Sequence, residues 1–192
     1  MSESLPRLTG LNHVAFATAD LDATIAFWRD LIGLRLVFGC PEAVGRQYFF
    51  EIAPGSLISF FEWEGVEPPP YKHHGAPVRG PFAFDHLAIG VADLDALWQM
   101  QARLDAADIP VSDVVDHGFL YSIYSHDPNH IPLEFNCRVP GVDVSAQPRM
   151  GDPQASALAL EGAEPRSDRW PEGRMDPTGR VIVPGGGKDC VP

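Results

Sequence analysis

The sequence predicts an α+β fold in which two tandem βαβββ modules form a cupped mixed sheet with the helices outside. The main observation is an internal repeat. Residues Asn12–Ala15 recur as Asp85–Ala88, and the five residues Ala19–Ala23 recur unchanged as Ala92–Ala96, both at an offset of 73 residues. Self-similarity at one offset is typical of a duplicated unit. In each copy, one strand-like run is followed by one helix-like run and three further strand-like runs.

Each module is expected to begin with a strand and a helix. Short alternating or apolar runs predict strands at Leu11–Thr18 and Phe84–Val91. Asp20 and Asp93 are good N-caps for the helices that follow. The first helix should bury Leu21, Ile25, Trp28 and Leu31 or Ile32 and end at Gly33, and the second should bury Leu94, Leu97, Trp98 and Leu104 and end before Pro110.

Three more strands should follow each helix. They are expected at Leu34–Phe38, Gln47–Ile52 and Leu57–Trp63, then at Val111–Val115, Leu120–Ser125 and Ile131–Asn136. This gives one domain over residues 8–138, with module one at 8–64, a proline-rich linker at 65–82 and module two at 83–138. The Pro/Gly-rich tail, 139–192, has too few large apolar residues for its own core. The alternatives are a disordered tail and a tail that wraps over the body or a partner subunit, and the possible anchors Trp170 and Val181–Val183 favour the wrap.

The composition narrows the class of partner. A net charge of −12 opposes the phosphate backbone of nucleic acid. The chain has no run of about 20 apolar residues to span a membrane and no signal-peptide pattern at its start. Its three scattered cysteines predict neither a disulfide framework nor a metal knuckle. We therefore expect a cytoplasmic protein that binds small molecules and neither nucleic acid nor membrane.

Strand alternation places three metal-ligand side chains on the open face of the sheet, away from the helices. These are His13, His86 and Glu134. Two imidazoles and one carboxylate suit Fe(II) with open coordination positions, and Mn, Ni, Co or Zn can also bind such a set. A single histidine near a strand start is more often a hydrogen-bonded core residue. The repeat favours a metal site instead, because it places both histidines at equivalent points, and a glutamate on an apolar strand needs a partner.

Several motifs resemble the glyoxalase/bleomycin-resistance/extradiol-dioxygenase superfamily, also called vicinal oxygen chelate. They are His13, Phe27–Leu34, Ser122–Tyr124, Asp127–Asn129 and Leu133–Phe135, and the resemblance covers roughly residues 8–138. It implies paired βαβββ modules cupped around one metal ion, with ligands from the first and last strands of the modules. His13, His86 and Glu134 match those positions. Dimers are common in that family, so the resemblance also implies a homodimer.

In many relatives the last strand of the first module supplies a fourth ligand. Matching Leu57–Phe60 to Pro132–Phe135 places Ser59 there, which is a poor ligand, whereas a strict offset of 73 selects Phe61, which cannot bind metal. Glu62 falls on the opposite face from Ser59 unless the strand parity shifts. A set of two histidines and one glutamate resembles that of extradiol dioxygenases.

This chain also resembles the extradiol dioxygenases in two residues expected near the metal. Tyr124 and His117 match a tyrosine and a histidine that bond the substrate oxygen and move protons, although each is equally compatible with an ordinary strand or loop residue. Ser59, Phe61 and Phe119 are expected to line the substrate pocket. His130 replaces the family's glycine in the turn after Asp127 and requires a positive φ. We expect His73, His74, His126 and His130 at the surface, with the pocket mouth as the alternative for His73 and His74.

Three functions are compatible with these features. The first is an extradiol-like dioxygenase acting on a small aromatic or enolisable substrate. The second is a glyoxalase-like lyase or epimerase that uses a metal-stabilised enolate and would need a fourth ligand. The third is a metal-free small-molecule-binding protein of the bleomycin-resistance kind. Metal content and oxygen consumption distinguish them.

Overall fold

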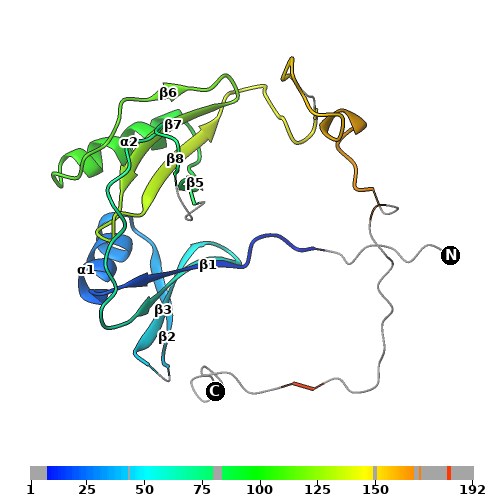
Figure 1. Cartoon of the computed structure of the whole chain (residues 1–192). Helices are drawn as coiled ribbons and strands as arrows, with labels where there is room; N and C mark the ends of the chain where they lie inside the picture. Colours follow the sequence, from blue (N-terminus) through cyan, green and yellow to red (C-terminus); the bar gives the residue numbers. More distant parts are fainter. Residues whose placement is uncertain are drawn as a thin grey trace.

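The computed structural model describes residues 8–42, 44–79, 84–148, 151–166, 169 and 181–182. Within these residues the chain forms two four-stranded mixed sheets, one in each module (Figure 1). The strand orders are β1-β4-β3-β2 and β5-β8-β7-β6. In both sheets the first strand runs parallel to the last, and the other neighbours are antiparallel. The predicted fold of two tandem βαβββ modules is confirmed.

The first module follows the predicted order of elements. It consists of β1 (His13–Thr18), α1 (Leu21–Ile25), the π-helical η1 (Ala26–Leu31), β2 (Arg35–Pro41), β3 (Arg46–Ala53) and β4 (Ser56–Glu62). The Asp20 side chain caps α1 by accepting from the backbone N–H of Ala23 at 2.9 Å. The predicted single helix widens into π-helical turns, in which the N–H of Ile32 bonds the carbonyl of Phe27 at 2.9 Å. Gly33 ends it with a φ of 94°.

The second module differs from the prediction at two places. It consists of β5 (Leu87–Gly90), α2 (Leu94–Asp105), β6 (Val115–Asp116), β7 (Leu120–His126) and β8 (Pro132–Arg138). Trp98 is 50% exposed rather than buried, because neighbouring helix positions face different directions and Leu97 takes the core position. The strand predicted at Val111–Val115 shrinks to β6. Upstream of β6, the N–H of Tyr124 bonds the Ser112 hydroxyl at 2.9 Å in place of a backbone carbonyl.

The modules are joined by a shared core and by the turn between β7 and β8. Buried residues of both modules, including Trp28 and Phe135, belong to one hydrophobic cluster. The Trp28 Nε1–H donates to Asp127 Oδ2 at 3.2 Å, and the Thr18 hydroxyl donates to Asn129 Oδ1 at 2.7 Å. Arg103 of α2 donates to backbone carbonyls at the end of η1. The positive φ required at His130 is confirmed, at 58°.

The described part of the tail is irregular except for one short 3-10 turn, η2 (Ala159–Glu161), and it extends away from the sheets in Figure 1. The predicted wrap is not supported at Val181 and Ile182, which are 79% and 98% exposed. Trp170 and Val183 lie outside the described residues. In the part of the chain that the structure describes, every helix is too short or too polar to cross a membrane.

Candidate metal centre

The second module brings His86 and Glu134 together on its open face. Their strands are parallel neighbours, with Ala88 aligned to Glu134. His86 Nε2 lies 2.8 Å from Glu134 Oε2. The other carboxylate oxygen, Oε1, accepts from the Ser122 hydroxyl at 2.7 Å and from Asn136 Nδ2 at 3.0 Å. One oxygen of this buried glutamate is therefore held by neutral donors, while the other faces the imidazole.

The second nitrogen of His86 also faces a carboxylate. Nδ1 lies 2.6 Å from Asp85 Oδ2, and the ammonium of Lys72 lies 2.8 Å from Asp85 Oδ1. The hydrogen bond from Lys72, followed by that from His86, holds the pKa of Asp85 below its usual value. Lys72 belongs to the linker between the modules, so the linker contributes directly to the surroundings of His86.

The spacing of this pair suits two ligands of one metal ion. Adjacent ligands of an octahedral ion with bonds of about 2.1 Å lie about 3.0 Å apart. The 2.8 Å between His86 Nε2 and Glu134 Oε2 is close to that separation. The chemistry of the pair, one imidazole and one carboxylate, fits a divalent ion of the kind that the sequence predicts.

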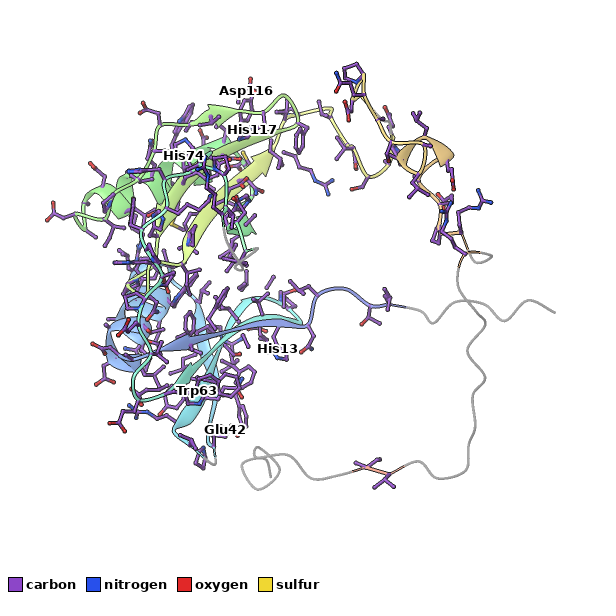
Figure 2. The ribbon with its side chains drawn as sticks, viewed as in Figure 1. His13, Glu42, Trp63, His74, Asp116 and His117 are labelled. Carbon is purple, nitrogen blue, oxygen red and sulfur yellow. The ribbon has the colours of Figure 1, made fainter. Side chains whose placement is uncertain are left out.

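The predicted third ligand, His13, lies elsewhere. It is exposed at the start of β1, where Nδ1 meets the amide oxygen of Asn12 at 2.8 Å and the ring edge meets Phe49, with 5.8 Å between ring centroids. Figure 2 shows it on the first module, while His74 and His117 lie at the second. Among the described residues, no group of three or more His, Cys, Asp or Glu side chains is arranged to hold a metal. The structure thus assembles two of the three predicted ligands.

Ser59 is the counterpart of Glu134 in the first module. The register aligns Ala15 with Ser59, as it aligns Ala88 with Glu134. This agrees with the motif match and not with the strict offset of 73 residues. Ser59 is fully buried and accepts from Gln47 Nε2 at 3.1 Å. The first module therefore presents a neutral pair where the second presents a carboxylate.

Glu62 and Phe61 point to different surroundings. Glu62 binds Arg46 Nε at 2.6 Å and accepts from the backbone N–H of Leu21 at 3.1 Å, so it is engaged at the start of α1 and away from Ser59. Arg46 holds the pKa of Glu62 below its usual value. Phe61 stacks on Trp63, with 4.9 Å between ring centroids, and lines a shallow pocket of about 430 Å³ on the first module.

Tyr124 and His117 are in contact with each other. His117 Nε2 lies 2.8 Å from the Tyr124 hydroxyl, and Tyr124 aligns with Glu134 across β7 and β8. Burial, followed by the charge of Glu134, raises the pKa of Tyr124, which keeps the phenol protonated at neutral pH. Phe119, in the loop before β7, is 43% exposed.

Sequence reasoning missed the contribution of Lys72 in the linker and gave the pocket mouth only as the alternative for His74. A cavity of about 190 Å³ is lined by Lys72, His74, Asp85, His86, Tyr124 and His126, among others. The His74 ring stacks on Tyr124 at 4.6 Å with an interplanar angle of 5°. His74 is exposed as expected and still reaches the site. The position of Asp85 directly before the repeated His86 could have indicated that Asp85 belongs to the site. No comparable feature of the sequence indicated Lys72.

The surface positions predicted for His126 and His130 are wrong. Both are half-buried beneath the linker, because His126 Nε2 meets the carbonyl of Lys72 at 2.8 Å and His130 Nδ1 meets that of Pro69 at 3.1 Å. The Tyr71 ring covers His126, with 4.0 Å between centroids. Burial lowers the pKa of His126. These contacts fix the linker along the β7–β8 turn.

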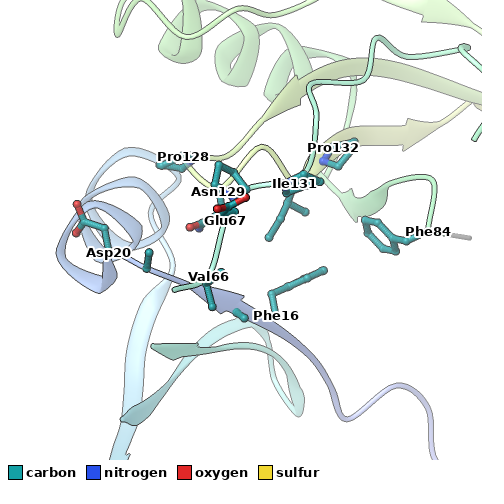
Figure 3. Close-up of a pocket in the computed structure, with 13 residues that line it drawn as sticks. Phe16, Asp20, Val66, Glu67, Phe84, Pro128, Asn129, Ile131 and Pro132 are labelled. Carbon is teal, nitrogen blue, oxygen red and sulfur yellow. The ribbon is translucent and has the colours of Figure 1, made fainter. Parts of the chain in front are cut away.

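Another cavity, of about 380 Å³, lies between the modules and is larger than the one beside His86 (Figure 3). Its wall is mostly apolar and comes from β1, the linker and the β7–β8 turn. The residues include Phe16, Val66, Phe84, Asn129, Ile131 and Pro132. Pro132 also lines the smaller cavity beside His86, so the two cavities are neighbours.

Comparison with known proteins agrees with the fold. A family model described as Glyoxalase/Bleomycin resistance protein/Dioxygenase superfamily matches residues 10–135. An iron-dependent extradiol dioxygenase from Rhodococcus jostii is 29% identical over 139 residues, which are 67% of this chain and 43% of that protein. A 2-epi-5-epi-valiolone epimerase from Actinomyces sp is 25% identical over 108 residues, which are 48% of this chain and 57% of that protein.

Among solved structures, a glyoxylase/bleomycin resistance protein/dioxygenase domain from Frankia sp. EAN1pec superposes with a TM-score of 0.58 at 18% identity, covering 69% of this chain and 100% of that one. The chain spans about half the length of the curated relatives it matches.

Proposed function

Because the chain belongs to the glyoxalase/bleomycin resistance protein/dioxygenase superfamily, we propose that it is a divalent-metal-dependent enzyme, and more narrowly an extradiol-like dioxygenase for a small aromatic or enolisable substrate. The observation that carries the proposal is the pair of His86 Nε2 and Glu134 Oε2, 2.8 Å apart on the open face of the second module. Ser59 in place of a fourth metal ligand favours the dioxygenase over the four-ligand enzymes.

We propose His13, His86 and Glu134 as the metal ligands, with Fe(II) fitting best and Mn, Ni, Co or Zn as alternatives. The proposal requires His13 to approach the other two when the metal binds. A bound ferrous ion would supply Lewis-acid and redox chemistry at the open face. The carboxylate of Glu134 is kept aligned for this role by Ser122 and Asn136.

The roles of the remaining residues follow from their contacts. The protonated phenol of Tyr124 donates a hydrogen bond to a substrate oxygen, and His117, 2.8 Å from the phenol oxygen, exchanges a proton with it. His74 stacks on Tyr124 and restricts the phenol ring. Phe61 and Phe119 are the proposed substrate contacts, and their aromatic rings suit an apolar, planar substrate. The contact predicted at Ser59 is not proposed, because this side chain is fully buried and bonded to Gln47.

The test is metal analysis of anaerobically purified protein, followed by oxygen consumption with Fe(II) and a panel of catechols. We expect one divalent ion per chain, lost in His86→Ala and in Glu134→Gln. Glu51→Gln, which alters a half-buried glutamate paired with Arg35 on the first module, is the matched control and should retain the metal. Absence of stoichiometric metal, with ligand binding unaffected by His86→Ala, would contradict the enzyme and favour a metal-free binding protein.

The likeness to the Actinomyces epimerase supports a second candidate, a lyase or epimerase that passes through a metal-stabilised enolate. Turnover of a thiol adduct with Ni or Zn, without oxygen consumption on any catechol, would favour this candidate. Both enzymes share the proposed metal ligands, so the choice between them rests on the substrate panel and not on metal content.

A further inference from the structure

In each module, the residue before the repeated histidine contacts the same ring nitrogen. Asn12 Oδ1 lies 2.8 Å from His13 Nδ1, and Asp85 Oδ2 lies 2.6 Å from His86 Nδ1. The two contacts differ in charge, since the first partner is an amide and the second a carboxylate. Asp85 has in addition a cation on its other oxygen, Lys72 Nζ at 2.8 Å.

His86 therefore lies between two carboxylates. Asp85 faces Nδ1 and Glu134 faces Nε2, at 2.6 Å and 2.8 Å. A neutral imidazole carries one N–H, so the two carboxylates compete for one proton. If the proton is on Nε2, His86 donates to Glu134 and has no lone pair there for a cation. If it is on Nδ1, Nε2 presents its lone pair beside the free oxygen of Glu134.

Three observations favour the proton on Nδ1. The contact at Nδ1 is the shorter of the two, and it recurs in both modules, whereas the carboxylate at Nε2 does not, because Ser59 replaces it in module one. Lys72 fixes the Asp85 carboxylate from the linker, so Oδ2 stays turned toward His86. Ser122 and Asn136 hold Oε1 of Glu134, so in the Nδ1–H form Oε2 and the Nε2 lone pair are left facing each other, 2.8 Å apart, as the two donors for a cation.

We propose that Asp85 is a positioning residue that holds His86 in the Nδ1–H form, with Lys72 of the linker orienting its carboxylate, so that Nε2 remains a metal donor next to Glu134. The hydrogen bond behind a metal-binding histidine sets which nitrogen is free and orients the ring. The inference rests on the proposed function for its purpose, but the position of the proton can be measured without any metal.

The first experiment uses the metal-free, 15N-labelled full chain at a pH where the His86 ring is neutral. Long-range 1H–15N spectra distinguish the Nδ1–H from the Nε2–H form, and His86→Gln identifies the signals. We expect Nδ1–H in the wild type and in Asp85→Asn, whose amide oxygen repeats the Asn12 contact. We expect Nε2–H in Asp85→Ala, where Glu134 becomes the remaining carboxylate partner. Nε2–H in the wild type, or unchanged Nδ1–H in Asp85→Ala, would overturn the proposal.

The second experiment measures Co²⁺ affinity by spectroscopic titration against a competing chelator. Asp85→Ala should weaken binding roughly 10- to 100-fold, as loss of such partners typically does, and Asp85→Asn should weaken it less. Glu51→Ala, which removes an exposed ion pair with Arg35 of 2.7 Å, is the control and should bind as the wild type. Wild-type affinity in Asp85→Ala would refute positioning. A wild-type protein that binds no metal would refute the proposed function. The role of Asp85 in fixing the His86 tautomer would still be decided by the spectra of the metal-free protein.

Discussion

Ser59 and Glu134 occupy equivalent positions in the two modules, and the first side chain is neutral while the second is a carboxylate. Ser59→Glu alone places a charge at a fully buried position and should destabilise the fold by about 2–4 kcal/mol. Ser59→Glu with Gln47→Ser repeats the Ser122–Glu134 pair. We expect this double variant to recover part of the stability and to bind divalent metal about tenfold more tightly, because a carboxylate ligand is added.

Urea unfolding and metal titration test both effects. Unchanged metal affinity in a stably folded double variant would show that position 59 does not face the metal. The comparison with Ser59→Gln, which adds bulk without charge, separates the effect of size from that of charge.

His126 gives the fold a pH dependence that can be assigned. Burial first, then the nearby charges of His130, His73 and Lys72, lower its pKa in the folded state, while the bond to the Lys72 carbonyl opposes the shift. The unfolded chain therefore binds a proton more readily. Stability should fall as the pH drops below the ordinary value of 6.5 and through the lowered pKa, and should be fully present above 6.5.

Urea unfolding at pH 7.5 and pH 5 measures this loss, which should be smaller in His126→Gln than in the wild type. An equal loss in both proteins would assign the pH dependence to other groups.

The sequence did not predict the surroundings of some residues, because these depend on contacts between distant segments. Strand alternation fixes the face of a side chain, and His86 and Glu134, which were predicted on one face, lie 2.8 Å apart. Pattern reasoning could not place His126 and His130, which are covered by a linker whose proline-rich sequence predicts no path. Trp98 shows a related limit, since periodicity allowed both Leu97 and Trp98 to face the core and packing chose Leu97.

The β7–β8 turn is the element that joins the modules. Asp127 Oδ2 accepts from Trp28 Nε1 at 3.2 Å, and Oδ1 accepts from the backbone N–H groups of Asn129 and Ile131, both at 2.9 Å. Asp127→Ala leaves these donors unpaired in a buried place and should reduce the free energy of unfolding by about 2–4 kcal/mol. Asp143→Ala is the matched control, because Asp143 also accepts from two backbone N–H groups but is exposed.

Urea unfolding compares the two variants, and the control should lose less than about 1 kcal/mol. If Asp127→Ala cost no more than Asp143→Ala, the turn would not be the joint between the modules. The Asp-Pro-Asn sequence predicted a turn here, but its contact with Trp28 joins residues 99 positions apart and has no local signal.

At the scale of the molecule, the repeat predicted both modules but not how they meet. Face parity assigns a side chain to one side of its own sheet, whereas the distance from His13 to His86 depends on the packing between the sheets. That packing is set by the shared core and by Thr18, Trp28, Asp127 and Asn129, whose contacts the repeat does not contain. The approach of His86 to Glu134 within the second module was therefore predictable, whereas the position of His13 relative to this pair was not.

The tail should be dispensable for the stability of the two modules. Beyond Pro148, the large apolar residues that the structure describes are exposed, with Leu158 at 61% and Leu160 at 66%, and Glu161 pairs with Arg166 and Arg169 within the tail. A chain ending at Pro148 keeps the Arg138–Asp143 pair, 3.2 Å apart, and should melt within about 2 °C of the full chain with the same metal content.

Scanning calorimetry and sedimentation velocity on the full and shortened chains test this expectation together with the proposed homodimer. Exposed apolar residues on the first module, Val37, Val44 and Trp63, offer a surface for self-association that the shortened chain retains. We therefore expect both chains to sediment as dimers. A shortened chain that sediments as a monomer and melts at a lower temperature would instead assign the dimer contact to the tail, because loss of a partner lowers the apparent stability of the folded state.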